Sequence, residues 1–320
     1  MKPFFLKTTI LILISITALI SSEKLFKWFL SSTSGGMIST EEQIDKSFNL
    51  ALNNNYKTLI VGSSRIYRGV NPDKLTFSEA FNFGHDNDSY NQIFYKLLFL
   101  EKKKKAFNYL ILGTDYFQFS IFSDTRNYVY RKYLDKKYLK DYKNYHWKDT
   151  DNKVNRWITI HFSNIFKFFT TRLKNIIIKK ETYSYLTKKG QFVTQLKSDP
   201  RPINQGNNEN DAILLQKKYF DKIFQFCKRK KITVFMVMPP ARTEELKNIS
   251  QSTLKLYDFF LDSTIKKQKG YYLNYAADQR FTGEDFADIA HLGKEGADKF
   301  SNILNQDIII ILEKIKNTKK

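Results

Sequence analysis

Four short apolar runs, each bounded by turn-forming residues, constrain the fold of this chain more than any other feature. They span residues 58–61, 80–83, 109–112 and 232–238, and a weaker fifth run spans 271–273. Apolar runs of this length without alternation are typical of strands that are buried on both faces. Helical patterns lie between them, at residues 90–100 and 212–226. The alternation predicts an α/β fold in which a central parallel sheet lies between two layers of helices.

The alternation breaks between residues 117 and 210, where the chain is aromatic, basic and without clear strands. We interpret this stretch as a long helical insertion. Ligands of doubly wound sheets bind at the carboxyl ends of the strands, and the insertion leaves from one such end. Two interpretations stay open: the insertion walls or covers a ligand site, or it is a helical decoration that does not touch the ligand.

The N-terminus has the pattern of an export signal. Lys2 and Lys7 precede a stretch without charge at residues 8–22, and residues 25–30 are rich in aromatic side chains. A basic start before an apolar stretch is typical of a secretion signal, and aromatic side chains favour the membrane interface. We therefore expect a signal-anchor at residues 1–30, a linker at 31–40 and an extracytoplasmic domain at 41–320. A cleaved signal peptide is the alternative.

The net charge is strongly positive, because 53 Lys and Arg residues stand against 32 Asp and Glu residues, which gives +21. Such a surplus can indicate a nucleic-acid partner, but export argues against that partner and we expect none. Two interpretations remain. The surplus is a solvated basic surface, or it attracts an anionic cell-surface polymer or lipid headgroup.

Ser64 is the first candidate for chemistry. The first predicted strand runs directly into Gly62, Ser63 and Ser64. A serine on a tight turn at the end of a buried strand exposes its hydroxyl at the edge of the sheet and leaves its own N–H free to face an oxyanion. Ser64 is therefore a candidate nucleophile, although Ser and Gly at strand ends also serve simply as turn formers.

The next two strand ends carry small and polar residues of the same kind. Gly84 follows the second strand, and its N–H can approach a substrate closely as an oxyanion donor because glycine has no Cβ. Gly113, Thr114 and Asp115 follow the third strand. Three consecutive strand ends of this character favour a site at the carboxyl edge of the sheet.

Asp288 and His291 lie near the C-terminus, just before a helical pattern. Three residues of separation across a turn allow a carboxylate to reach one ring nitrogen of an imidazole, which leaves the other nitrogen to take a proton from a serine. The start of a helix also opposes a charged imidazolium and favours the neutral base. Asp288 would then orient His291, although the same spacing is also common in capping and surface pairs.

In this order, the motifs resemble the sequence blocks of the SGNH/GDSL hydrolases. Gly62-Ser63-Ser64 resembles the first block, with Ser in place of the usual Asp. Asn82-Phe83-Gly84 resembles the second block, and Asp288 with His291 falls in the last. The resemblance covers nearly the whole globular part, and it implies a flavodoxin-like three-layer α/β/α sandwich.

The resemblance also implies a role for each matched residue. Ser64 would be the nucleophile, His291 the general base and acid, and Asp288 its orienter. The amides of Ser64 and Gly84 would be the oxyanion donors. The third block departs from the family, because Asp115 stands where an oxyanion-binding Asn is usual. A carboxylate there would repel the developing charge, so either the oxyanion hole has backbone donors only or Asp115 plays a different part.

Four further residues are tentative substrate contacts. Arg65 follows the candidate nucleophile and is interpreted as a contact for an acidic group or as a cap on the sheet edge. Asp115 and His85 follow strand ends, and Arg242 follows the fourth strand at the same rim. For His85, a structural or exposed side chain is the alternative. We expect no cofactor and no metal. Cys227 is the single cysteine, which excludes an intrachain disulfide and a cysteine-rich metal site.

Within the superfamily, the Gly-Ser-Ser-Arg start, the anchor and the insertion look most like the cell-envelope acylation branch. That branch includes the D-alanyl transfer protein of teichoic acid synthesis and the alginate O-acetylation proteins. The resemblance implies an extracytoplasmic serine esterase or O-acyltransferase, with an acylated glycan or polyol polymer as substrate. It also implies the membrane and a membrane-bound O-acyltransferase as partners. The alternative is a non-catalytic assembly or polymer-binding protein on the same fold.

Overall fold

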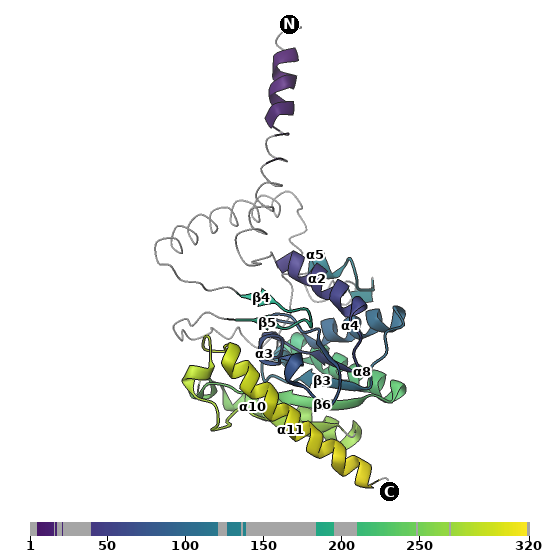
Figure 1. Cartoon of the computed structure of the whole chain (residues 1–320), viewed down its shortest axis with the longest axis vertical. Coiled ribbons are helices and arrows are strands. Elements are labelled where there is room, and N and C mark those ends of the chain that lie inside the picture. The colour runs from purple at the N-terminus through teal and green to yellow at the C-terminus, as the bar shows by residue number, and fades with distance from the viewer. Residues whose placement is uncertain are drawn as a thin grey trace.

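The described part of the chain is an α/β fold with helices on both sides of a central sheet (Figure 1). The computed structural model in Figure 1 describes residues 5–15, 17, 21, 40–120, 127–135, 137–138, 184–194, 210–247, 249–268 and 270–318.

Five parallel strands form the central sheet. In spatial order they are β2 (Ala80–Asn82), β1 (Thr58–Val61), β3 (Tyr109–Gly113), β6 (Thr233–Met238) and β7 (Tyr271–Asn274). Every adjacent pair is parallel. The parallel sheet predicted from the apolar runs is therefore confirmed, including its weaker fifth strand.

The helices that cover the sheet follow the predicted alternation. They are α2 (Thr40–Asn53), α3 (Ser64–Gly69), α4 (Tyr90–Lys102), α5 (Asn127–Tyr130), α8 (Asn210–Lys230), α9 (Thr243–Leu246), α10 (Gln251–Gln268) and α11 (Lys294–Thr318). Three single turns of 3-10 helix are η1 (Pro72–Lys74), η2 (Gln118–Ser120) and η3 (Gly283–Asp285).

Alternate side chains of each strand enter two different cores. In β1, Leu59 and Val61 pack in a core with α2, α4, α8 and α10, whereas Ile60 packs in a second core with α3 and α11. The reason is the two-residue period of a strand, which sends successive side chains to opposite faces of the sheet. Because both faces are covered, the strands read as continuous apolar runs in the sequence.

The chain order creates a switch point between β1 and β3. From β1 the chain passes through α3 to β2 on one side, and from β2 it passes through α4 to β3 on the other side of β1. Helices α3 and α4 contribute to different cores and so lie on opposite faces. Doubly wound sheets bind ligands outside the carboxyl ends of the strands at such a point.

The insertion contains a short hairpin, although the sequence predicted no strands between residues 117 and 210. Strands β4 (Tyr185–Leu186) and β5 (Phe192–Val193) pair antiparallel. Their turn reaches the sheet edge, where Asn82 N–H donates to Lys189 O at 2.9 Å. Gly190 has φ +87°, and a Cβ there would lie 2.0 Å from Asn82 O, so the turn requires glycine. Two-residue strands are too short to give a periodic signal. Most of the insertion lies outside the described residues.

The same hairpin packs against α3. Gln191 Nε2 donates to Arg68 O at 3.0 Å, and the Phe192 ring stacks on Tyr67 with ring centroids 5.6 Å apart. The insertion therefore touches the helix that carries Ser64.

At the N-terminus, residues 5–15 are helical and exposed. In the part of the chain that the structure describes, no helix combines the length and the apolar character needed to cross a membrane. In the rest of the predicted anchor, the structure describes residues 17 and 21, and in the predicted linker at 31–40 it describes residue 40. The other residues of these two segments lie outside the described residues.

Candidate active site

The turn between β1 and α3 places Ser64 at the carboxyl edge of the sheet. Ser63 is the N-cap of α3 and Ser64 is its first residue. A Cβ on Gly62 would lie 2.8 Å from Ile66 Cβ and 3.1 Å from Gly113 Cα, so a side chain has no room there. Because these glycines let α3 pack directly on β1 and β3, the backbone of the sheet sets the position of Ser64.

Ser64, His291 and Asp288 are hydrogen-bonded in series. His291 Nε2 lies 2.7 Å from Ser64 Oγ, and His291 Nδ1 lies 2.8 Å from Asp288 Oδ2. An ionised carboxylate only accepts, so these contacts require the tautomer with its proton on Nδ1. In that tautomer Nε2 has a free lone pair that can take the serine proton. The three residues predicted to form a triad are thus brought together.

The loop around Asp288 holds this carboxylate in place. Asp288 Oδ1 accepts the backbone N–H groups of Ala290 and His291, both at 2.8 Å, and Ala287 N–H donates to His291 O at 2.8 Å. The carboxylate is therefore fixed by its own loop as well as by the imidazole.

These contacts keep Asp288 ionised far into the acid range. Burial acts to raise the pKa of Asp288, but the hydrogen bond and charge of His291 and the two backbone N–H groups outweigh burial. The result is a pKa of about 2 in place of the usual 3.8.

We expect Asp288→Asn to lose stability in a pH-dependent way. A carboxyl whose pKa falls from 3.8 in the unfolded chain to about 2 in the folded protein stabilises the fold above about pH 4, and this contribution is lost as the pH falls through about 2. The difference in unfolding free energy between parent and variant should therefore shrink over that range. Urea unfolding at a series of pH values measures it, with Asp262→Asn on the exposed face of α10 as control. A pH-independent difference would contradict the expectation.

The two predicted oxyanion amides differ in their surroundings. The N–H of Ser64 has no hydrogen-bond partner among the described residues, as expected in the first turn of a helix. The N–H of Gly84 donates to Asn82 Oδ1 at 3.0 Å. The Ser64 amide is free to face an oxyanion, whereas the Gly84 amide is engaged within its own loop.

Asn82 is a positioning residue that the sequence did not single out for a role of its own. Its Nδ2 donates to Ile66 O and to Val70 O, both at 3.0 Å. Ile66 O also accepts the N–H of Val70, the residue that caps α3, so Asn82 adds to the contacts at the C-terminal end of this helix. Asn82 therefore ties α3 to β2. A polar residue in a buried strand was the available signal, because such a residue needs a hydrogen-bond partner.

Arg65 and Asp115 lie in a buried charge cluster, and the predicted substrate contacts at these residues are corrected accordingly. Arg65 is 3% exposed. Its guanidinium contacts Glu245 Oε1, and its Nη2 donates to Tyr116 OH at 3.0 Å. Asp115 is 1% exposed, with its Oδ1 3.4 Å from Arg65 Nε and its Oδ2 accepting from Ser63 Oγ at 3.0 Å. The cluster supports the turn before Ser64 from within the protein.

The pKa of Asp115 is raised by its complete burial, against the opposing effects of the Arg65 charge and the Ser63 hydrogen bond. This environment explains why an Asp stands at position 115, where the resemblance led us to expect an Asn. Asp115 directs its carboxylate at Ser63 and Arg65, where it acts as a structural anchor.

His85 is buried as well, and its predicted substrate contact is replaced by a packing role. It is 1% exposed, its ring stacks on Tyr67 with centroids 5.0 Å apart, and its backbone N–H donates to Gly62 O. A partly exposed ion pair lies on the same side of α3, where Arg68 binds Asp86 through two hydrogen bonds of 3.0 and 2.7 Å.

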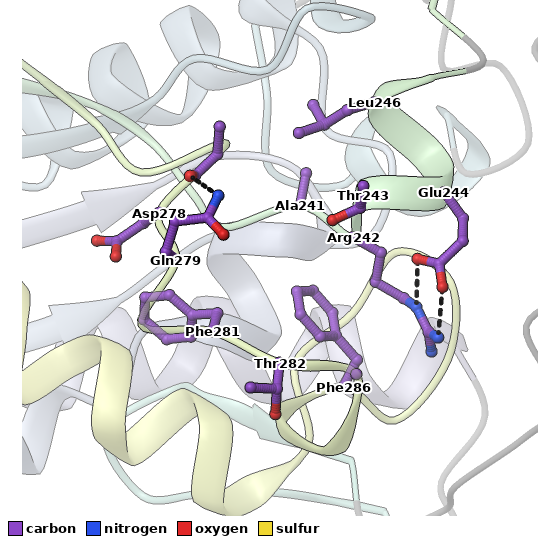
Figure 2. A pocket seen from close by; sticks show the side chains of 12 residues that line it. Ala241, Arg242, Thr243, Glu244, Leu246, Asp278, Gln279, Phe281, Thr282 and Phe286 are labelled. Atoms are coloured by element: carbon purple, nitrogen blue, oxygen red, sulfur yellow. Dashed lines mark hydrogen bonds and ion pairs between the residues drawn. The ribbon is translucent and has the colours of Figure 1, made fainter.

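Arg242 lines a pocket at the carboxyl ends of β6 and β7 (Figure 2). The cavity has a volume of about 220 Å³. Its walls come from residues 241–246 and 277–286, and the second segment leads directly into the loop of Asp288. Arg242 is thus a predicted substrate contact that lines a cavity.

Comparison with known proteins gives no family for this chain: no protein-family model matches it, and no curated protein matches it. Within the described ranges, no group of three or more His, Cys, Asp or Glu side chains is arranged to hold a metal ion.

Proposed function

We propose that this chain is a serine esterase or O-acyltransferase of the SGNH/GDSL type. One observation carries the proposal: Ser64 Oγ, His291 Nε2, His291 Nδ1 and Asp288 Oδ2 form a continuous hydrogen-bonded series with steps of 2.7 and 2.8 Å. A non-catalytic binding protein on the same fold has no need of this series, which is why we favour the enzyme.

The geometry supports a two-step reaction. Ser64 Oγ attacks the carbonyl carbon of an ester while its proton passes to His291 Nε2, and the carbonyl oxygen becomes an oxyanion within reach of the Ser64 amide. When this intermediate collapses, the C–O bond to the alcohol breaks and His291 returns the proton to the leaving alcohol. Water or a sugar hydroxyl then attacks the acyl-Ser64 ester and gives its proton to His291. The bond between the acyl carbon and Ser64 Oγ breaks, and His291 returns the proton to Ser64 Oγ. Asp288 stabilises the imidazolium that forms in both steps.

The place and substrate of this chemistry are proposed from the sequence. The basic start and the apolar stretch favour an extracytoplasmic domain held at the membrane, and the charge of +21 favours proximity to an anionic surface. Envelope acylation of a glycan or teichoic-type polymer fits these features. A membrane-bound O-acyltransferase would supply the acyl group, and anchoring would raise the effective concentration of Ser64 near it.

We expect Ser64→Ala in the producing cell to lower the ester-linked acyl groups of an exported polymer, because the acyl-Ser64 intermediate can no longer form. The measurement is alkali-labile acetate or alanine on polymer isolated from parent and variant cells. The same cells are fractionated, and we expect the protein in the membrane fraction. An equal amount of the variant protein in that fraction is the control. A rise in acyl groups would identify a hydrolase, and unchanged polymers would contradict the envelope role.

A further inference from the structure

The chain segments that line the pocket around Arg242 contact the segments that carry His291 and Ser64. On one side, Phe286 lines the pocket and bridges Leu292, the residue after His291. On the other side, Glu244 and Leu246 line the pocket, while Glu245 between them contacts Arg65, the residue after Ser64. The pocket walls are thus connected directly to the segments that carry His291 and Ser64.

One wall of the pocket carries two aromatic rings, and the facing wall carries polar side chains together with Ala241 and Leu246. Figure 2 shows the rings of Phe281 and Phe286 on one side of the cavity, with Gln279 and Thr243 on the other. Phe286 is buried, whereas Thr243 and Gln279 are exposed. Gln279 Nε2 donates to Ala277 O at 3.0 Å, so its Oε1 and the Thr243 hydroxyl are the groups offered near the opening. The pocket therefore offers an apolar surface opposite hydrogen-bonding groups.

The charges at the pocket compensate one another. Arg242 donates to both carboxylate oxygens of Glu244 at 3.3 Å, and Asp278 accepts from Arg280 through hydrogen bonds of 2.5 to 3.0 Å. A phosphate or a carboxylate ligand would have to compete with Glu244 for Arg242. The walls consequently favour a neutral ligand.

The volume restricts the size of that ligand. Pockets for drug-sized molecules span roughly 300–1,000 Å³. A cavity of about 220 Å³ is smaller and suits a single ring. A pyranose has an apolar C–H face for Phe281 and Phe286, and hydroxyl groups for Thr243 and Gln279.

We propose that this pocket is a subsite for one neutral sugar ring of the polymer. The neighbouring sugar unit would then lie at Ser64 and take part in the acyl transfer. The inference rests on the proposed function and narrows its substrate from any glycan or polyol polymer to a neutral glycan. Phosphate-linked polyols and uronic acids fit the subsite less well, because its arginine is already paired.

The test is binding of cellotriose and N,N′,N″-triacetylchitotriose, both neutral, to the full-length Ser64→Ala protein, measured by isothermal titration calorimetry. This variant lacks the proposed nucleophile, so binding is measured without catalysis. We expect at least one of the two sugars to bind with a millimolar Kd. Gln279→Ala combined with Thr243→Ala should weaken it about tenfold, since two hydrogen bonds of roughly 1 kcal/mol or less each are lost. Thr243→Trp, which fills the cavity, should abolish binding. Gln306→Ala, on the exposed face of α11, is the matched control and should bind as the parent does.

Binding of neither sugar, or sugar binding that survives Thr243→Trp, would overturn the subsite. Saturable binding of glycerol 3-phosphate that Thr243→Trp abolishes would overturn its neutral character. These outcomes are distinct from failure of the proposed function. If the sugar binds but Ser64 of the parent does not react with a serine-directed probe, the subsite stands and the enzyme proposal fails.

Discussion

Ser64→Ala should abolish labelling of the purified protein by a fluorophosphonate probe and lower ester hydrolysis by a factor on the order of 10⁴ or more. The probe reacts with a serine whose hydroxyl is activated by a neighbouring base. Ser64 Oγ meets this condition, because it lies 2.7 Å from His291 Nε2. The variant removes one oxygen atom at a position that is 8% exposed, so we expect the fold to remain intact.

Ser63→Ala is the matched control, since it changes the adjacent serine in the same turn. The hydroxyl of Ser63 donates to Asp115 and so belongs to the buried cluster, whereas His291 Nε2 is hydrogen-bonded to Ser64. Labelling should persist in this variant. Labelling of Ser64→Ala, or a label mapped to Ser63 by peptide mass spectrometry, would refute the assignment of Ser64 as nucleophile.

Arg65→Ala should destabilise the protein by about 3–5 kcal/mol, the usual cost of removing one partner from a buried ion pair. The reason is that Asp115 and Glu245 both contact the buried guanidinium and would remain in the interior without a cation. The loss should grow as the pH rises. Burial raises the pKa of Asp115, and without Arg65 this pKa should rise further. At low pH the carboxyl of the variant is protonated and its burial costs little, whereas at higher pH it must ionise without a cation beside it.

Urea unfolding at two pH values measures this effect, and Arg68→Ala is its control. Arg68 is also an arginine of α3 with an acidic partner, but its pair with Asp86 is partly exposed, so Arg68→Ala should cost less stability than Arg65→Ala. If the two variants lose similar stability, the buried cluster is not the structural element that we infer.

The strands and the order of the site motifs were predictable because they depend on local pattern. Each buried run is bounded by turn residues, and a parallel sheet must bring the ends of such runs to one edge. The pairing of Ser64 with Asp288 and His291 was implied by the resemblance of the motif order to the SGNH/GDSL blocks. In the structure, the helix that follows His291 packs in the same core as α3.

The supporting contacts were not predictable for equally physical reasons. Arginine is mostly exposed in proteins, so Arg65 was expected at the rim. Its burial depends on Glu245, which lies 180 residues further along the chain and gives no local signal. The role of Asn82 likewise depends on carbonyls of another element, and the hairpin at Gly190 is too short to produce a pattern.

The contact between Gly62 and Gly113 separates the placement of Ser64 from the residues that line the pocket. The close approach of Gly62 and Gly113, the Asn82 side chain and the buried Arg65 cluster hold α3 against the sheet, so Ser64 owes its placement to positions that do not line the pocket. Thr243, the first residue of α9, and Gln279 are exposed, so their side chains can vary without moving the sheet. Under the proposed function, substrate preference would therefore be open to redesign, or to divergence during evolution, by exchange of these exposed residues while Ser64 stays where it is.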